Sequence, residues 1–198
     1  MIFCSLISQS NSVQRNNLRI VSGKFRHRLI SWPEDNVNIR PTKDRIREAI
    51  FNALGDLEGM KCLDLYSGSG AMGIEALSHN AKSCIFVDIN DVAINTTKKN
   101  LKSLNIDERE YRVIKTTDEN ALNLFIKEKM QFDLIFLDPP YKLGEYEKVI
   151  RTILDNDLLS LKGIIVTECD HKLDLPVSEF RKTKEYKYGE ILVNILWR

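Results

Sequence analysis

Residues 62–73, CLDLYSGSGAMG, constrain the fold of this chain more than any other stretch. An apolar run ends at Leu65, glycines follow at Gly68 and Gly70, and a helix-like pattern continues to Leu77. We therefore predict a buried strand, a tight glycine turn and the start of a helix. Glycine adopts positive φ and has no side chain, so a ligand can approach the turn closely, and the helix N-terminus offers free N–H groups. The segment predicts a nucleotide-type binding site.

Two kinds of nucleotide fit this segment. Residues 68–73 match the pattern G-x-G-x-x-G, and Asp88 lies 20 residues after Gly68, which is typical of dinucleotide-binding oxidoreductases. Asp64 argues against that interpretation, because a carboxylate four residues before Gly68 would repel a pyrophosphate and attract an ammonium group. S-adenosylmethionine carries an ammonium group and no phosphate. The spacing D-x-x-x-G-x-G therefore resembles the first motif of class I S-adenosylmethionine-dependent methyltransferases, and an NAD(P)-dependent oxidoreductase is the less favoured alternative.

Apolar strand patterns alternate with helical patterns along most of the chain. Strands are expected at 62–65, 84–87, 113–114, 132–137 and 163–167, and helices at 42–54, 71–77, 91–104, 121–129 and 145–154. This alternation predicts an α/β fold with a parallel sheet covered on both faces. Residues 181–188 and 191–197 predict a closing antiparallel pair of strands. Because parallel strands end at one edge of a sheet, Gly68, Asp88 and Asp138 should meet there.

Several polar residues follow the predicted strands. Asp91 is the expected N-cap of its helix, and Glu168 is expected just after the last parallel strand. Asp118, Glu119 and Asn120 precede another helix, and any of them could hold the amino group of an adenine or cap that helix.

The N-terminal part of the chain is basic. Residues 1–47 contain nine Lys or Arg and three Asp or Glu, although the net charge of the whole chain is only +1. Residues 1–17 are expected to be a disordered tail, residues 18–41 a basic hairpin extension, and residues 42–198 the main domain. A basic end on an acidic body suggests a polyanion partner, and basic side chains on the hairpin can contact phosphates without reading sequence.

A helix is expected to start at Thr42, a suitable N-cap, and to end before Gly55. Its apolar residues form one stripe. Arg45 and Arg47 are two residues apart, so they should point to different faces. The residues alone favour an amphipathic helix with solvated arginines.

The sequence Asp138-Pro139-Pro140-Tyr141 directly follows the expected strand 132–137. Two prolines stop the strand and fix φ, so the turn is stiff. The Asp138 carboxylate and the Pro139 carbonyl can each accept one N–H of an exocyclic amino group, which turns the nitrogen lone pair toward an electrophile. Tyr141 offers a ring on which the base can stack, worth roughly 1–3 kcal/mol. Catalysis of this kind depends on orientation and placed acceptors.

The bulk composition fits one globular domain of 198 residues with 43% hydrophobic residues. The four cysteines, Cys4, Cys62, Cys84 and Cys169, have no metal-ligand spacing, so we expect reduced thiols and no metal site. The chain shows no apolar run of membrane-spanning length and no basic flank of a signal peptide. We expect a cytoplasmic protein that does not contact membranes.

Three blocks in this order, IRPTKDRIREAIFNAL, LDLYSGSGAMGIEAL and DLIFLDPPY, resemble the bacterial small-subunit ribosomal RNA methyltransferase D family, the 16S rRNA guanine-N2-methyltransferases. The segment LRIVSGKFRHR resembles the hairpin of that family. The resemblance implies a class I (Rossmann-like) sheet of seven strands, mostly parallel with the last strand antiparallel. It implies methyl transfer from S-adenosylmethionine, with S-adenosylhomocysteine as product, to the N2 amino group of a guanine in 16S rRNA within an assembling small ribosomal subunit. We expect a monomer.

The resemblance also implies roles for individual residues. The target base would be handled by Asp138, Pro139, Pro140 and Tyr141. The cofactor would be bound by Asp64, Tyr66, Ser67, Gly68, Ser69, Gly70, Asp88, Ile89, Asn120 and Thr42. RNA would be bound by Arg19, Lys24, Arg26, Arg28, Arg40, Arg45 and Arg47, of which residues 40–47 would form a lid over cofactor and RNA. Asp88 stands where the family pattern leads us to expect Glu, which keeps the charge with a shorter reach.

Two further alternatives stay open at this point. A DNA adenine-N6 methyltransferase shares the Asp-Pro-Pro-Tyr chemistry, but it would need a target-recognition region, for which we find no segment. A non-catalytic RNA-binding module on the same scaffold would not need Asp138.

Overall fold

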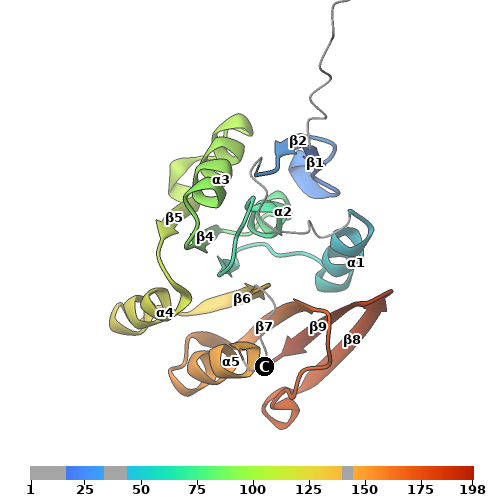
Figure 1. Cartoon of the computed structure of the whole chain (residues 1–198), viewed down its shortest axis with the longest axis vertical. Helices are drawn as coiled ribbons and strands as arrows, with labels where there is room; N and C mark the ends of the chain where they lie inside the picture. The colour runs from blue at the N-terminus through green and yellow to red at the C-terminus, as the bar shows by residue number, and fades with distance from the viewer. Residues whose placement is uncertain (1–16, 34–43, 140–144) are drawn as a thin grey trace, which may run out of the picture.

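The computed structural model describes residues 17–33, 44–139 and 145–198 (Figure 1). The strands are β1 (Asn17–Arg19), β2 (Leu29–Ser31), β3 (Lys61–Asp64), β4 (Ser83–Asp88), β5 (Tyr111–Lys115), β6 (Phe132–Leu137), β7 (Leu159–Cys169), β8 (Lys182–Tyr188) and β9 (Ile191–Trp197). The helices are α1 (Asp44–Leu54), α2 (Ala71–Ser78), α3 (Asp91–Ser103), α4 (Asp118–Lys127) and α5 (Glu145–Asp155), with short 3-10 helices η1 (Gly23–Phe25), η2 (Glu108–Glu110) and η3 (Val177–Glu179). In the described part of the chain, no helix is both long and apolar enough to cross a membrane.

The main sheet has seven strands in the order β5-β4-β3-β6-β7-β9-β8. Neighbouring strands from β5 to β7 pair in parallel, and β9 pairs antiparallel with both β7 and β8. The order reverses between β3 and β6, which is where ligands bind in open α/β sheets. The predicted class I (Rossmann-like) sheet with an antiparallel last strand is confirmed.

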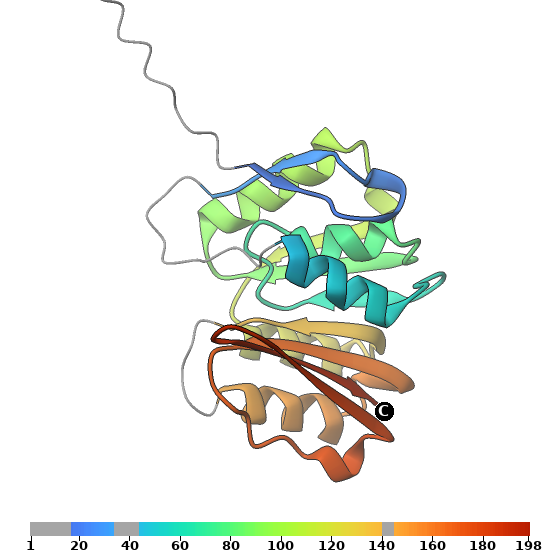
Figure 2. The same cartoon turned by 90° about the vertical axis from the view of Figure 1, so that its right-hand side faces the viewer.

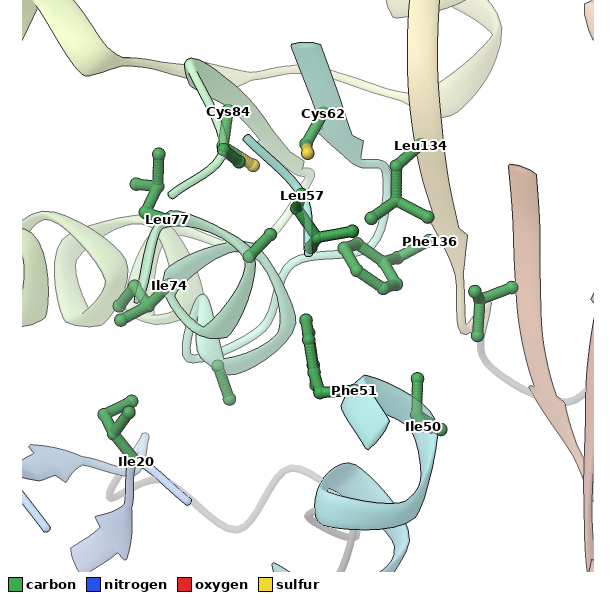
Figure 3. Close-up of a cluster of buried hydrophobic side chains, with 14 of the residues drawn as sticks. Ile20, Ile50, Phe51, Leu57, Cys62, Ile74, Leu77, Cys84, Leu134 and Phe136 are labelled. Carbon is green, nitrogen blue, oxygen red and sulfur yellow. The ribbon is translucent and has the colours of Figure 1, made fainter. Parts of the chain in front are cut away.

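Helices cover both faces of the sheet (Figure 1). Helices α1, α2 and α3 share one buried cluster with the sheet, and α4 and α5 share a second cluster with the opposite face. In the first cluster, Phe51 of α1 points toward Phe136 of β6, and their ring centroids lie 5.8 Å apart (Figure 3). Gly73 of α2 packs closely on β4, because an added Cβ would lie 2.3 Å from the Phe86 ring. These contacts fix α1 and α2 above the strands that carry the polar residues described below.

Two expected element boundaries were wrong. Strand β7 continues to Cys169, so Glu168 lies inside the strand, because the antiparallel ladder with β9 extends to the pair Cys169–Leu192. Helix α3 is capped by Asn90, whose side chain accepts hydrogen bonds from the N–H groups of Val92 and Ala93, and Asp91 lies in the first turn instead.

The predicted N-terminal hairpin is present, although the link between β1 and β2 is longer than expected and contains η1. The hairpin lies against α2 and α3 (Figure 2). The N–H of Val21 donates to Glu75 at 2.7 Å, and the N–H of Phe25 donates to the Ser78 hydroxyl at 2.9 Å. The N–H of Ser31 donates to the Asn100 side chain at 2.8 Å, and the Asn100 amide donates back to the Ser31 carbonyl at 2.9 Å. The described hairpin is therefore held by directed hydrogen bonds to the main domain.

Arg47 was expected on the RNA-binding surface, and the structure corrects this expectation. Its side chain is completely buried, whereas Arg45 is exposed, because residues two apart on a helix such as α1 point to different sides. The guanidinium donates to the Arg19 carbonyl, pairs with Asp44 at 2.9 Å and lies 3.5 Å from the buried Glu75 carboxylate. Arg47 thus joins α1, α2 and β1 from the inside and is excluded from the RNA-binding set.

We predict that Glu75→Ala lowers the free energy of unfolding by about 3–5 kcal/mol, because it removes a fully buried carboxylate 3.5 Å from the Arg47 guanidinium and the acceptor of the Val21 N–H. Chemical denaturation monitored by circular dichroism measures this change. Glu128→Ala is the matched control, since Glu128 pairs with Arg112 at 3.2 Å on the surface and its loss should cost less than about 1 kcal/mol. Equal losses in the two variants would show that the Arg47–Glu75 pair does not hold the hairpin side of the domain together.

Candidate active site

The glycine turn between β3 and α2 has the predicted conformation. Gly68 and Gly70 have φ values of +52° and +79°, which disfavour residues with a Cβ. A Cβ on Gly70 would lie 2.9 Å from the Thr97 side chain, whereas a Cβ on Gly68 would meet no atom of the described residues within 4 Å. Gly70 is therefore required by packing against α3, and Gly68 faces open space that a ligand can occupy.

Helix α3 holds this turn in place from behind. The Thr97 hydroxyl donates to the Gly68 carbonyl at 3.0 Å, and the Asn100 amide donates to the Ser69 carbonyl at 2.9 Å. Because Asn100 also bonds to Ser31, one buried side chain connects the N-terminal hairpin to the glycine turn. Sequence reasoning missed Thr97 and Asn100. Their spacing of three residues on the buried face of a helix was the available signal.

Asp64 ends β3 beside the turn and is only 4% exposed. It accepts a hydrogen bond from the Gly73 N–H at 3.0 Å. Burial raises the pKa of Asp64 to about 7, the Gly73 amide opposes this shift, and the charge of Asp88 adds to it. A cationic ligand beside Asp64 would favour the ionised carboxylate. The carboxyl group beside the glycine turn can therefore be protonated or ionised near neutral pH. This is the carboxyl group that was predicted to attract an ammonium group.

Asp88 ends β4, as expected, and stabilises the loops on either side of it. Its two carboxylate oxygens accept hydrogen bonds from the N–H groups of Gly68 and Asn90, both at 2.8 Å. Each oxygen has a second lone pair, so contacts to ribose hydroxyls stay a prediction. The neighbouring Ile89 is 65% exposed, which leaves an apolar side chain available at the same edge.

Tyr66 and the polar residues at the start of α4, which were expected near the cofactor, take part in different hydrogen bonds. The Tyr66 hydroxyl donates to Asp118 at 2.8 Å, which joins the glycine turn to the first turn of α4. The N-cap of α4 is Thr117, whose hydroxyl accepts from the Asn120 N–H at 3.2 Å, so of the two alternatives for residues 118–120 the structure does not support helix capping. The Asn120 residue is exposed, and its contact to adenine stays a prediction.

A single pocket joins the glycine turn to the end of β6. Asp64 and residues 66–69 line one part of it, and Asp138 and Glu168 line another. The expected convergence of the turn and Asp138 in one cleft is confirmed. Sequence reasoning missed Glu168, and it also missed two apolar wall residues from the N-terminal hairpin region, Leu18 and Trp32. An aromatic residue just after a predicted hairpin strand was the only signal for Trp32.

Asp138 follows β6, and Pro139 beside it is buried. The pKa of Asp138 lies above its ordinary value, first because the surrounding protein removes water from the carboxyl and then because Glu168 and Asp64 repel its charge. Residue 138 itself is exposed to solvent. Thr42, Arg40, Pro140 and Tyr141 lie outside the described residues.

The remaining basic residues predicted to bind RNA lie on the surface. Arg19, Lys24, Arg26, Arg28 and Arg45 are all exposed. Lys24 also pairs with Glu110 at 3.3 Å, and Arg28 donates to the Ser103 carbonyl at 3.0 Å. Within the described ranges, no group of three or more His, Cys, Asp or Glu side chains is arranged to hold a metal ion.

Comparison with known proteins gives relatives that match over most of their lengths. A family model described as "Conserved hypothetical protein 95" matches residues 18–197. The Bacillus subtilis protein YlbH is 38% identical over 175 residues, covering 87% of this chain and 94% of that protein. The Escherichia coli protein named ribosomal RNA small subunit methyltransferase D is 31% identical over 171 residues, covering 86% of this chain and 83% of that protein.

Solved structures agree with these sequence matches. The Escherichia coli protein yhhF superposes with a TM-score of 0.78 at 29% identity, covering 92% of this chain and 98% of that chain. A Thermus thermophilus 16S rRNA N2 methyltransferase, RsmC, crystallised with AdoMet and guanosine, has a TM-score of 0.68 at 18% identity and covers 92% of this chain and 49% of that chain, which supports the fold alone. From the matching family model, the sequence relatives and the shared architecture, the chain belongs to the ribosomal RNA small subunit methyltransferase D family.

Proposed function

We propose that this protein transfers a methyl group from S-adenosylmethionine to the N2 amino group of a guanine in 16S rRNA of the small ribosomal subunit. The observation that carries the proposal is the pocket shared by the glycine turn, Asp64 and Asp138. A donor held at the turn and an amino group held at Asp138 would occupy one cleft. Family membership supports the choice of ribosomal RNA, because the named relatives are ribosomal RNA methyltransferases.

The residues at the turn fit S-adenosylmethionine. The buried Ser67 hydroxyl has no hydrogen-bond partner among the described residues, and Gly68 faces open space. Asp64 supplies a carboxylate for an ammonium group, and the charged neighbour that acts on its pKa is another carboxylate, Asp88. When bound there, the cofactor would supply a methyl group on a positively charged sulfur. A pyrophosphate fits less well, because it would face the charges of Asp64 and Asp88.

The chain's own contribution to the chemistry is orientation and proton acceptance. The Asp138 carboxylate and the Pro139 carbonyl would each accept an N–H of the target amino group, which directs the nitrogen lone pair away from both acceptors. Once methylated, the amine carries a positive charge and readily loses a proton. A carboxylate with a raised pKa is a stronger base than an ordinary one, so Asp138 suits the role of proton acceptor. Placed acceptors of this kind account for a large share of many enzymatic rate accelerations.

The exposed basic residues would contact RNA near this cleft. Arg19 belongs to β1 and lies next to Leu18, which lines the pocket. Arg26 and Arg28 lie on the same hairpin, and Arg45 lies on α1. Such side chains would position the RNA backbone, while the pocket would select the base.

The function is tested by mass spectrometry of nucleosides from small-subunit ribosomal RNA of cells with and without the protein. We expect one N2-methylguanosine to disappear without it. We further expect Asp138→Ala to lower kcat by about a hundredfold or more while the affinity for S-adenosylmethionine stays within about threefold. Ribosomal RNA with unchanged N2-methylguanosine, together with N6-methyladenine formed in plasmid DNA, would favour a DNA methyltransferase.

A second prediction concerns pH. Since the pKa of Asp64 is raised to about 7, the carboxylate is mostly protonated at pH 5.5 and cannot attract an ammonium group well. We expect the affinity for S-adenosylmethionine to fall about tenfold from pH 7.0 to pH 5.5, measured by isothermal titration calorimetry. In the ligand-free protein, the contribution of Asp64 to the free energy of unfolding should instead increase as the pH falls from 7.0 to 5.5, since protonation of this buried carboxyl favours the folded state. Asp64→Asn should bind weakly and with little pH dependence, and a wild-type affinity equal at both pH values would contradict the assignment.

A third prediction concerns the hairpin. Replacing Arg26 and Arg28 together by Ala should weaken RNA binding and lower the slope of log affinity against log salt by roughly two, one for each phosphate contact. Filter binding at several salt concentrations measures the slope. Lys127→Ala is the control, because Lys127 is exposed on α4, across the sheet from the hairpin. An identical slope in the hairpin variant and the control would remove these arginines from the interface.

A further inference from the structure

We propose that one face of the edge strand β8 binds single-stranded RNA next to the target base. The inference rests on the proposed function and adds a second RNA-binding surface to it. Strand β8 ends the main sheet at the side of β7 and β9, whereas the N-terminal hairpin contacts α2 and α3 over the other side (Figure 2). Every second residue of β8 faces the same way. The face in question carries two lysines and two tyrosines, Lys182, Lys184, Tyr186 and Tyr188.

The register of the sheet places this face beside the pocket. Glu168, which lines the pocket, pairs directly with Val193 of β9, and Val193 pairs directly with Tyr186 of β8. Residues directly opposite each other in an antiparallel pair point to the same face. Tyr186 therefore shares the face of Glu168 at two strand spacings, about 10 Å. Tyr188 lies on the same face, nearer to the turn that joins β8 to β9.

The two tyrosines are supported by the core without being enclosed in it. Tyr186 and Tyr188 both pack against the buried cluster that contains Ile191 and Val193, and both are only partly buried. Aromatic rings held on the face of a sheet are a common platform for the unpaired bases of single-stranded RNA. Such stacking tolerates any base, so this face would hold the strand without reading its sequence.

The two lysines continue the same row and are exposed. The ammonium group of Lys182 lies 4.7 Å from the centroid of the Trp197 ring, and that of Lys184 lies 6.0 Å from the centroid of the Tyr186 ring. These contacts keep both charges close to the tyrosines. Phosphates of a strand whose bases stack on the rings would have two cations within reach.

Lysines on an edge strand have a second role, because their charges oppose pairing with another chain. That role would not depend on which face of β8 a lysine occupies. Lys187 lies on the opposite face of the same strand and is also exposed. The two roles therefore predict different results when the lysines of the two faces are compared.

Oligouridylate is a single-stranded RNA without the target base, and fluorescence anisotropy at several salt concentrations measures its binding. Replacing Lys182 and Lys184 together by Gln should lower the slope of log affinity against log salt by roughly 1.4, as expected for two contacts to single-stranded phosphates. Lys127→Gln combined with Lys187→Gln is the matched control. Both residues are exposed and belong to the opposite side of the sheet, so this control should keep the wild-type slope.

The tyrosines are tested with the same probe. Replacing Tyr186 and Tyr188 together by Leu should weaken the binding of oligouridylate at least about fivefold, because the rings are lost while apolar bulk is kept. Phe at both positions keeps the rings, so the affinity should stay within about twofold of wild type. With small-subunit RNA as substrate, the Leu variant should raise KM more than it lowers kcat.

Equal salt slopes in the two lysine variants would overturn the inference, even if the Leu variant fails to fold. A folded Leu variant that binds oligouridylate as tightly as the Phe variant would also overturn it. If the wild-type protein methylates no guanine of small-subunit RNA, the proposed function itself fails, whereas the comparison with oligouridylate still decides whether this face binds RNA.

Discussion

The parallel pairing of β3 with β4 on one side and β6 on the other is the constraint on which the site depends. It brings the ends of three strands to one edge, so Asp64, Asp88 and Asp138 lie close together although they are far apart in the sequence. The next strand, β7, adds Glu168 by the same register. Burial raises the pKa values of Asp64 and Asp138, and the neighbouring carboxyl groups raise them further, so this edge suits ligands that bring positive charge or hydrogen-bond donors.

The N-terminal hairpin is part of this arrangement. Its described residues bond to α2 through Glu75 and Ser78 and to α3 through Asn100, and Asn100 continues to the glycine turn. The buried Arg47 of α1 lies beside Glu75 of α2 and also donates to the Arg19 carbonyl of β1. Leu18 and Trp32 of the hairpin region also line the pocket. An element that looks like a separate basic appendage thus completes the wall of the cleft and contacts the helix that supports the turn.

The sequence allowed the sheet, the glycine turn and the shared cleft of Asp64 and Asp138 to be predicted, because strand periodicity, glycine and proline act locally. It did not allow the roles of Arg47 and Glu168 to be predicted. Arg47 was taken for a surface residue because burial of a charge depends on a partner, Glu75, that belongs to another helix. Glu168 was expected just after the strand, but it lies inside β7, because the length of β7 is set by its ladder with β9. Both errors concern pairings between segments distant in sequence, which periodicity does not show.

Above all, we propose that the glycine turn and Asp138 hold the two reactants in one cleft. A crystal structure of the protein with S-adenosylhomocysteine tests this most directly. We expect the ammonium group to contact Asp64, the adenosine to lie along the glycine turn toward Asp88, and the sulfur to face Asp138 across the pocket. A ligand bound elsewhere, or one whose sulfur points away from Asp138, would contradict it.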